Sequence, residues 1–402
     1  MLTWPQRTAV VSGNALEFYD IAVFAAISPY LAHILSNNGI ANSAYIVWGI
    51  FALRFLIRPF GGIVVGKVAD RKGRKKVLIM TSSITGIATL CMALMPTQLG
   101  EWVLIPFLLC QMAQAFSFGG EYPTIIQYLH RGSKENEKAR ISSLIVASSI
   151  VGVLVSLLLV LALKSSLTHT AMQQFGWRIP LIFGAINIAM SFWFRLRLPT
   201  EMLDKGTSVA SSEYAKKTSL IFLISATGAV IFYVQNLSSS ILSHSIAIPQ
   251  FGLINSSVLL ALILAVGWLT DKVSLSGRSF KLGVVLGVLA LYPCYSVLSS
   301  SHSLATQTIA LLVISIISAL VLANLAAVLF DIARGDTMAL GMGYNVALSI
   351  FGGLSPLVVK YLSGIDVSYI GAYAALAMLP ALFGIVLASK VSSPSSLENA
   401  SA

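Results

Sequence analysis

Residues 66–76 of the chain read GKVADRKGRKK and separate two long apolar runs. A related stretch, GWLTDKVSLSGR, occupies residues 267–278 and again follows an apolar run. The first glycines of the two stretches lie 201 residues apart, which is half of the 402-residue chain. The second copy is degenerate, because three extra residues separate its aspartate from its glycine. The same element at the same place in each half indicates two parallel repeats.

The composition places these repeats in a membrane. The chain is 56% hydrophobic and 10% charged, and its mean hydropathy is +0.85. An ordinary soluble domain carries about 25% charged residues, so this chain has too few to cover a water-exposed surface. Its apolar runs are continuous rather than alternating, and runs of about 20 residues are long enough to cross a bilayer as helices. We therefore predict an all-α polytopic membrane protein.

Apolar runs bounded by polar or Gly/Pro-rich gaps predict twelve transmembrane helices. Because twelve is even, both termini face the same side. The predicted helices lie at 10–35, 44–69, 77–95, 103–129, 141–163, 179–195, 218–245, 251–270, 282–300, 306–330, 339–363 and 370–389.

The distribution of positive charge then sets the side. Of the 26 Lys and Arg residues, 21 fall on the side of the termini, three fall on the other side, and the remaining two, Arg54 and Arg58, lie in the interior of the helix predicted at 44–69. This is a positive-inside pattern, so we expect both termini in the cytoplasm. It also accounts for the net charge of +11 without a nucleic-acid partner.

The domain organisation follows from the longest inner gap. Residues 196–217 are rich in Ser, Thr and charge, and we interpret them as a cytoplasmic linker. They divide the chain into an N-terminal six-helix bundle, residues 1–195, and a C-terminal six-helix bundle with a short tail, residues 218–402. The two halves are predicted to be pseudo-repeats of each other.

Five positions of the stretch 66–76 have a physical role in this scheme. Gly66 allows close helix packing, Asp70 can accept a helix end or a cation, and Gly73 permits a tight turn. Arg71 and Arg74 belong to a basic cluster that suits the anionic inner leaflet. The pattern resembles the hallmark loop of the major facilitator superfamily, which implies a part in conformational gating. The alternative is a basic loop that only sets the topology.

Four further motifs narrow the resemblance. They are GNALEFYD at 13–20, FLIRPFGG at 55–62, QAFSFGGEY at 114–122 and GWRIP at 176–180. In order and spacing they resemble the metabolite:proton symporters, which include proline/betaine, 2-oxoglutarate and citrate permeases. The second half resembles this family more weakly. The resemblance implies the major facilitator fold, alternating access, and proton-coupled uptake of a small polar solute in a bacterial inner membrane.

Five ionisable residues fall in the middle of predicted helices, at bilayer depth, where charge is costly and therefore a functional candidate. Glu17 and Asp20 are three residues apart, Arg54 and Arg58 are four apart, and each pair shares a helix face. Glu121 follows two glycines that allow close helix approach. We hypothesise that Glu17, Asp20 and Glu121 carry protons and that Arg58 moves relative to them, with the proton as coupling ion and no cofactor. The alternative is a static network of buried ion pairs.

Other polar residues are candidates for lining a central substrate cavity. Arg54 is among them, although it could equally snorkel or pair with Glu17. Asn and Gln side chains also serve as contacts between membrane helices, which is the alternative for each. The candidates are Tyr19, Arg54, Tyr122, Tyr233, Gln235, Asn236, Asn324, Tyr344 and Asn345.

Several other functions compete with symport. The run 141–163 lacks the Gly/Pro-rich motif of superfamily antiporters, which favours uptake over efflux. An uncoupled facilitator or a transporter-derived membrane sensor remains open, although a sensor need not keep the intramembrane charges. No metal-ligand spacing, nucleophile elbow or phosphate loop is present, so an enzyme is not expected. The expected partners are a small-molecule substrate and the lipid bilayer, with the protein a monomer.

Overall fold

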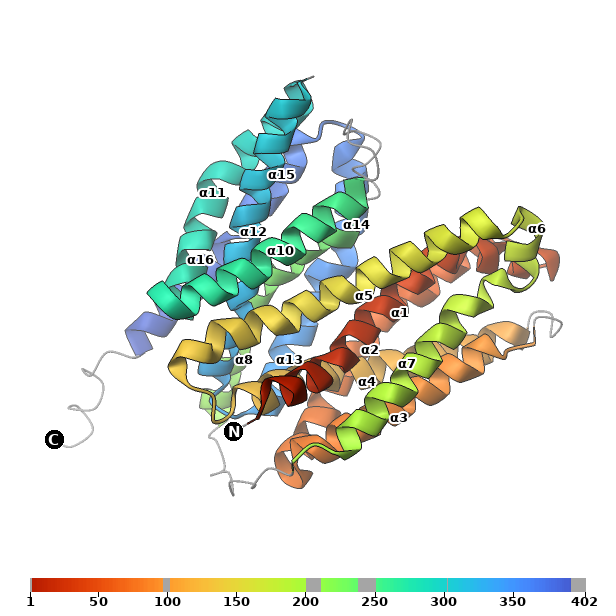
Figure 1. Cartoon of the computed structure of the whole chain (residues 1–402), viewed down its shortest axis with the longest axis horizontal. Coiled ribbons are helices and arrows are strands. Elements are labelled where there is room, and N and C mark those ends of the chain that lie inside the picture. Colours follow the sequence, from red (N-terminus) through yellow and green to blue (C-terminus); the bar gives the residue numbers. More distant parts are fainter. Residues whose placement is uncertain (1, 97–101, 200–210, 238–250, 302, 392–402) are drawn as a thin grey trace. The chain divides into compact units, whose positions relative to one another are not determined.

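The computed structural model is helical and describes residues 2–96, 102–199, 211–237, 251–301 and 303–391 (Figure 1). The chain forms two compact units. Unit 1 comprises Met1–Ser133 and Leu144–Gly206, and unit 2 comprises Lys134–Ser143 and Thr207–Ala402. The predicted boundaries of the two bundles and their linker stay a prediction.

Unit 1 consists of long helices joined by short turns. Its α1 begins six residues before the predicted start, because Thr3 and Gln6 form a capping box in which the Thr3 N–H donates to Gln6 Oε1 at 2.9 Å. The helices of unit 1 are α1 (Trp4–Asn37), α2 (Ser43–Lys72), α3 (Arg74–Ala93), α4 (Leu104–His130), most of α5 (Lys138–Ser166), the short α6 (His169–Ala171), the π-helical η3 (Met172–Gly176) and α7 (Arg178–Leu196).

Glycines set how closely α2 and α4 pack. A Cβ at Gly61 would lie 2.1 Å from the carbonyl oxygen of Phe116, and a Cβ at Gly119 would lie 2.1 Å from that of Arg58. Both distances are far below van der Waals contact, so any larger residue would push the backbones apart. Small residues at such crossings are typical of membrane helices. This packing fixes the position of Arg54 and Arg58 along α2 relative to α4.

Unit 2 is also built from long helices, two of which contain π-helical turns. The π turns are η4 (Tyr233–Leu237), which continues α8, and η5 (Leu348–Gly352), which joins α13 to α14. The other elements of unit 2 are η2 (Glu135–Glu137), α8 (Ser211–Phe232), α10 (Phe251–Val273), α11 (Ser276–Ser300), α12 (Leu304–Ala333), α13 (Thr337–Ala347), α14 (Gly353–Ser363), α15 (Ser368–Leu376) and α16 (Leu379–Val391).

Helix α8 begins seven residues before the helix predicted at 218–245. Its first turns are polar, and Glu213 and Lys217 form an i,i+4 pair at 2.9 Å that extends the helix beyond its apolar part. A hydropathy scan detects the apolar part alone. Residues 238–245 of the predicted helix lie outside the described residues.

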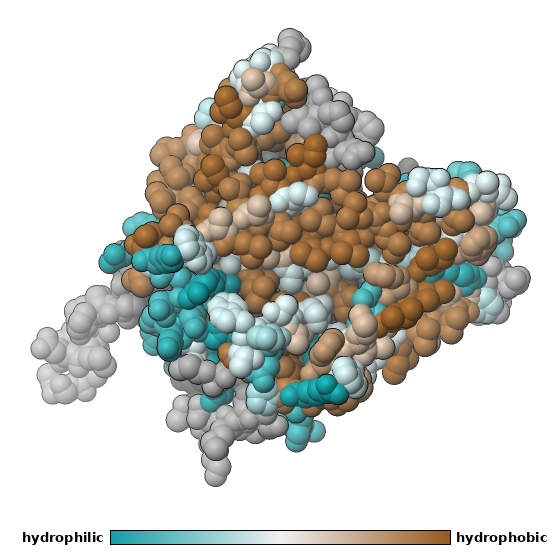
Figure 2. Space-filling view, in the orientation of Figure 1, coloured by the Kyte–Doolittle hydropathy of each residue, from teal (hydrophilic) through white to brown (hydrophobic). Residues whose placement is uncertain are grey.

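The helices expose apolar side chains on their outer faces. Figure 2 shows apolar surface along α5 and along α10, where Leu158, Leu161, Leu264 and Leu269 are 44–54% exposed. Within the described residues, ten helical spans are long and apolar enough to cross a membrane. Helices α2 and α4, 30 and 27 residues long, match the two other predicted spans. The prediction of an all-α polytopic membrane protein with twelve helices is confirmed.

Candidate functional site

The charged residues of α1 and α2 meet in an antiparallel register inside unit 1. Arg58 Nη1 lies 2.6 Å from Glu17 Oε1, and both side chains are buried. One turn away, Arg54 lies close enough to Asp20 for electrostatic interaction. Spacings of three residues on α1 and four on α2 place both acids opposite both guanidinium groups. The structure therefore pairs Arg58 with Glu17, and Arg54 interacts electrostatically with both acids.

Asp20 differs from the other buried acids because amide and hydroxyl groups hold it. Its Oδ2 accepts from Gln114 Nε2 at 2.8 Å and lies 3.3 Å from Thr89 Oγ1. Gln114 also donates to Thr89 at 2.7 Å, and Thr89 donates to the Thr85 carbonyl oxygen at 2.8 Å. Asp20 Oδ1 is buried and has no hydrogen-bond partner within the described residues. One oxygen of this carboxyl is thus available to hold a proton.

Glu121 on α4 is held by an arginine that the sequence did not single out. Arg195 Nη2 lies 2.5 Å from Glu121 Oε1, and Nη1 donates to the Leu78 carbonyl oxygen at 2.9 Å and to Ser82 Oγ. Gly13 makes room for this pair, since a Cβ there would lie 1.6 Å from Arg195 Nη2. Glu121 is also close enough to Glu17 for electrostatic interaction.

The charge count includes Arg195 among the inner positive charges, and the structure places it in the last turn of α7 rather than in a loop. Its side chain is fully buried, because α7 packs on α3 and turns this residue toward Glu121. Arg7, counted in the same way, is also buried, and its guanidinium carbon lies 4.5 Å from the centre of the Trp4 ring. Neither residue is a free loop charge.

Two of the four tyrosines proposed for the cavity are buried in unit 1. Tyr19 donates its hydroxyl to the Pro180 carbonyl oxygen at 2.7 Å, which ties α1 to the start of α7. Tyr122 is 3% exposed on α4, next to Glu121. The sequence did not indicate that Tyr19 contacts α7, although Pro180 belongs to one of the family motifs.

The polar candidates of unit 2 gather in part around η4. Asn255 Nδ2 on α10 donates to the Gln235 carbonyl oxygen at 2.6 Å and lies 3.1 Å from Gln235 Oε1. Ser256 donates to Asn236 Oδ1 at 3.1 Å. Tyr233 packs against Gly352 of η5, where a Cβ would lie 2.9 Å from its ring. π-helical turns are frequent at functional sites. Asn255 and Ser256 are members of this polar cluster that the sequence did not indicate.

Two of the remaining unit 2 candidates, Asn324 and Asn345, form hydrogen bonds within their own helices. Asn324 Nδ2 donates to the Leu320 carbonyl oxygen at 2.9 Å, and its Oδ1 has no partner within the part of the chain that the structure describes. Asn345 Nδ2 donates to the Gly341 carbonyl oxygen at 2.7 Å. Tyr344 is buried on the same helix, α13. Their role as cavity residues stays a prediction.

The stretch 66–76 forms the end of α2 and the start of α3. Gly66, Asp70 and Arg71 lie in α2, and Gly73 makes the turn with φ +94°, as the sequence predicts. Arg74 differs from the prediction, because it is buried rather than part of a basic cluster at the inner leaflet. Its Nη2 lies 3.8 Å from Asp70 Oδ1 across the turn.

The degenerate copy of this stretch caps a helix. The two Asp271 carboxylate oxygens accept from the backbone N–H groups of Ala139 and Arg140, each at 2.9 Å, and Arg140 Nε donates to Oδ2 at 2.9 Å. These contacts lie within unit 2 and hold the first turn of α5. An aspartate suits this position because a helix N-terminus carries unpaired N–H groups and a positive dipole end. No group of three metal-ligating side chains occurs over the described ranges.

Comparison with known proteins decides the family. The sequence model of the Major Facilitator Superfamily matches residues 10–356. The chain belongs to the Major Facilitator Superfamily. A transporter is thus identified, and an enzyme is excluded.

Two relatives of this Major Facilitator Superfamily transporter span nearly its whole length. It is 28% identical to the alpha-ketoglutarate permease of Escherichia coli strain K12, over 88% of this chain and 86% of the permease. It is 27% identical to the citrate-proton symporter of Klebsiella pneumoniae, over 87% of this chain and 83% of the symporter. The predicted resemblance to metabolite:proton symporters is confirmed.

A solved structure supports the fold of the transporter. The proton:xylose symporter XylE aligns with a TM-score of 0.74 at 14% identity, covering 96% of this chain and 95% of XylE. At this identity the likeness concerns the fold alone. Unit 1 of the transporter therefore places the buried acids Glu17, Asp20 and Glu121 beside the buried arginines Arg54, Arg58 and Arg195 on a superfamily scaffold.

Proposed function

We propose that the transporter takes up a small polar organic solute together with a proton, by alternating access in a bacterial inner membrane. The relatives named for alpha-ketoglutarate and for citrate and protons support a carboxylate, and the resemblance to proline/betaine permeases keeps an amino acid or a betaine open. We further propose that it acts as a monomer with both termini in the cytoplasm. The proton is the coupling ion, and no cofactor takes part.

The observation that carries this proposal is the unequal pairing of the three buried acids. Glu17 and Glu121 each lie within 2.6 Å of a guanidinium nitrogen, whereas Asp20 is hydrogen-bonded by Gln114 and lies beside Thr89, with Arg54 as its charged neighbour. A carboxylate that contacts a buried guanidinium group is stabilised in its charged form. Of the three candidate carriers, Asp20 is therefore the one that we assign to proton binding.

The local charges suggest how protonation affects unit 1. With Glu17, Asp20 and Glu121 ionised, their three negative charges balance those of Arg54, Arg58 and Arg195. Protonation of Asp20 at Oδ1 leaves a net positive charge beside Arg54. That charge favours an anionic group of the substrate nearby, so proton loading and binding of a carboxylate would reinforce each other.

Proteoliposomes under an imposed pH gradient provide the test. We expect the wild-type protein to accumulate a radiolabelled carboxylate such as 2-oxoglutarate, and a protonophore to abolish the accumulation. Asp20→Asn should lose gradient-driven accumulation but retain exchange of labelled for unlabelled substrate, because exchange needs no net proton movement. Thr89→Val disturbs the surroundings of Asp20 but keeps the titratable group, so we expect it to retain gradient-driven accumulation.

Each contrary result has a distinct meaning. Full gradient-driven accumulation by Asp20→Asn would contradict the assignment to Asp20. Exchange without any response to the gradient in the wild-type protein would identify an uncoupled facilitator. If a carboxylate, amino acid or betaine raises the unfolding temperature but is neither exchanged nor accumulated, the transporter-derived sensor becomes the better interpretation, because a ligand stabilises the state that it binds.

A further inference from the structure

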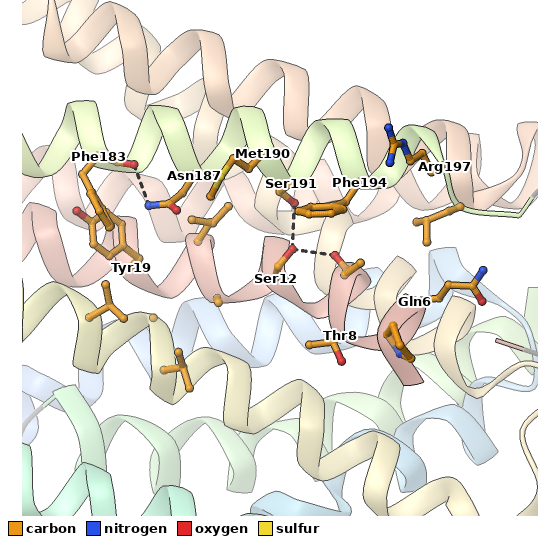
Figure 3. Close-up of a pocket in the computed structure, with 18 residues that line it drawn as sticks. Gln6, Thr8, Ser12, Tyr19, Phe183, Asn187, Met190, Ser191, Phe194 and Arg197 are labelled. Carbon is orange, nitrogen blue, oxygen red and sulfur yellow. Dashed lines mark hydrogen bonds between the residues drawn. The ribbon is translucent and has the colours of Figure 1, made fainter. Parts of the chain in front are cut away.

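Unit 1 contains a pocket that the proposed transport cycle does not use. It lies between α1, α5 and α7 and has a volume of about 870 Å³ (Figure 3). This is within the range of about 300–1,000 Å³ found for pockets that bury small ligands. The charged residues Glu17, Asp20 and Glu121 are not among its lining residues.

The middle of the pocket is suited to an aliphatic chain. Small residues of α1, namely Ala9, Ser12 and Ala15, form one wall, and larger apolar residues of α7 form another. The Ser12 hydroxyl donates to the Ala9 carbonyl oxygen at 2.8 Å, and Asn187 Nδ2 donates to the Phe183 carbonyl oxygen at 2.9 Å. These polar donors are already engaged within their own helices, so the middle offers little to a polar solute.

The apolar wall of α7 also belongs to the outer surface of unit 1. Phe183, Met190 and Phe194 are 39–51% exposed while lining the pocket. On a membrane-spanning helix, such side chains face the acyl chains of the bilayer. A lipid can therefore reach the pocket from the side.

One end of the pocket is cationic. Arg197 lies at this end with Gln6, and Tyr19 lies at the opposite end (Figure 3). The guanidinium carbon of Arg197 is 3.6 Å from the centre of the Trp193 ring. A guanidinium group that stacks on an aromatic face can still donate through its in-plane N–H groups. The loop charges predict that this end faces the cytoplasm, where the leaflet is anionic. A phosphate group is a suitable partner for such a guanidinium.

We propose that this pocket binds an anionic phospholipid of the inner leaflet. An acyl chain occupies the apolar middle between α1 and α7, and the phosphate contacts Arg197. The lipid lies against the face of α1 opposite its pairing with α2, where it supports the helix that carries Glu17 and Asp20. This proposal does not depend on the identity of the substrate or on proton coupling.

Native mass spectrometry of the detergent-purified protein tests the headgroup. With phosphatidylglycerol added, we expect one tightly retained lipid, and with phosphatidylethanolamine we expect weaker retention. Arg197→Gln should weaken binding of phosphatidylglycerol by about fivefold, which is the effect of one cationic side chain near a membrane surface. Arg278→Gln is the matched control, because Arg278 is an exposed arginine of unit 2 outside the pocket, and it should change nothing.

A second measurement locates the acyl chain without changing the protein. Phosphatidylglycerol with a photoreactive group on its chain should crosslink mainly to peptides of α1 and α7, and Ala9→Leu, which fills the pocket, should suppress these crosslinks. Equal retention of both lipids by wild type and Arg197→Gln would overturn the assignment of the phosphate. Crosslinks spread evenly over the outer helices would overturn the pocket as the binding site.

Discussion

The pair of Glu121 and Arg195 gives the sharpest test of the buried charges. The two side chains are 3% and 0% exposed, and their charged atoms are 2.5 Å apart. Removing one partner of a buried ion pair costs about 3–5 kcal/mol, because the other charge stays buried without compensation. Replacing both partners by uncharged groups of similar size often changes the stability very little. The double variant should therefore be more stable than either single variant.

A double-mutant cycle in detergent measures this difference. We expect Glu121→Gln and Arg195→Met each to lower the free energy of unfolding by about 3–5 kcal/mol, and the double variant to recover most of one such loss. Thermal unfolding followed by tryptophan fluorescence ranks the four proteins, with Trp193 on α7 near the site. Simple additivity, in which the double variant is the least stable of the four, would refute the pairing as the source of the cost.

The same cycle separates a structural role from a coupling role. If Glu121 stays ionised against Arg195 throughout transport, the single variants lose stability, and the double variant regains folded protein with gradient-driven accumulation. A double variant that is stable and exchanges substrate but cannot accumulate it would show that Glu121 itself carries the proton. In that case our assignment to Asp20 would be wrong.

Three further substitutions test the packing of the described helices. Asn14→Ala removes an amide that contacts the backbone and two serines of α5 at 2.7–2.9 Å. We expect the free energy of unfolding to fall by about 1–3 kcal/mol and the unfolding temperature to fall with it. An unchanged unfolding temperature would contradict this contact. Asp271→Ala removes the cap of α5, which should lower the free energy of unfolding by about 0.5–2 kcal/mol and speed hydrogen exchange of the amides in the first turn of α5. Unaltered exchange in that turn would count against the cap. Gly119→Val places a Cβ 2.1 Å from the Arg58 carbonyl oxygen, so folded monodisperse protein should be lost; a normal yield would contradict the close approach of α2 and α4.

The sequence predicted the helices well because the bilayer imposes a simple requirement. A run of about 20 apolar residues must cross as a helix, so hydropathy alone places twelve segments. The ends were less accurate, since polar caps and i,i+4 pairs extend helices beyond their apolar parts. Thr3 and Gln6 extend α1 in this way, and Glu213 and Lys217 extend α8. Such extensions depend on local hydrogen bonds that hydropathy does not measure.

The candidate site was predictable in its members but not in its pairings. Spacing on one helix places Glu17 with Asp20 and Arg54 with Arg58, yet it does not say which acid meets which guanidinium group. That choice depends on the vertical register of α1 against α2, which is set by contacts made elsewhere. Gln114 lies in a quoted family motif, but only the crossing of α4 with α1 brings it to Asp20.

Arg195 and Arg197 illustrate why charge counting fails at a helix end. Both are counted as inner charges, and two residues along a helix turn a side chain by about 200°, to nearly the opposite face. Arg195 therefore points into unit 1 and meets Glu121, while Arg197 points to the mouth of the pocket beside α1. The first arginine stabilises a buried acid, and the second offers a phosphate site at the surface. The end point and the rotation of α7 thus place these two arginines in different environments. A count of charges between apolar runs cannot distinguish them.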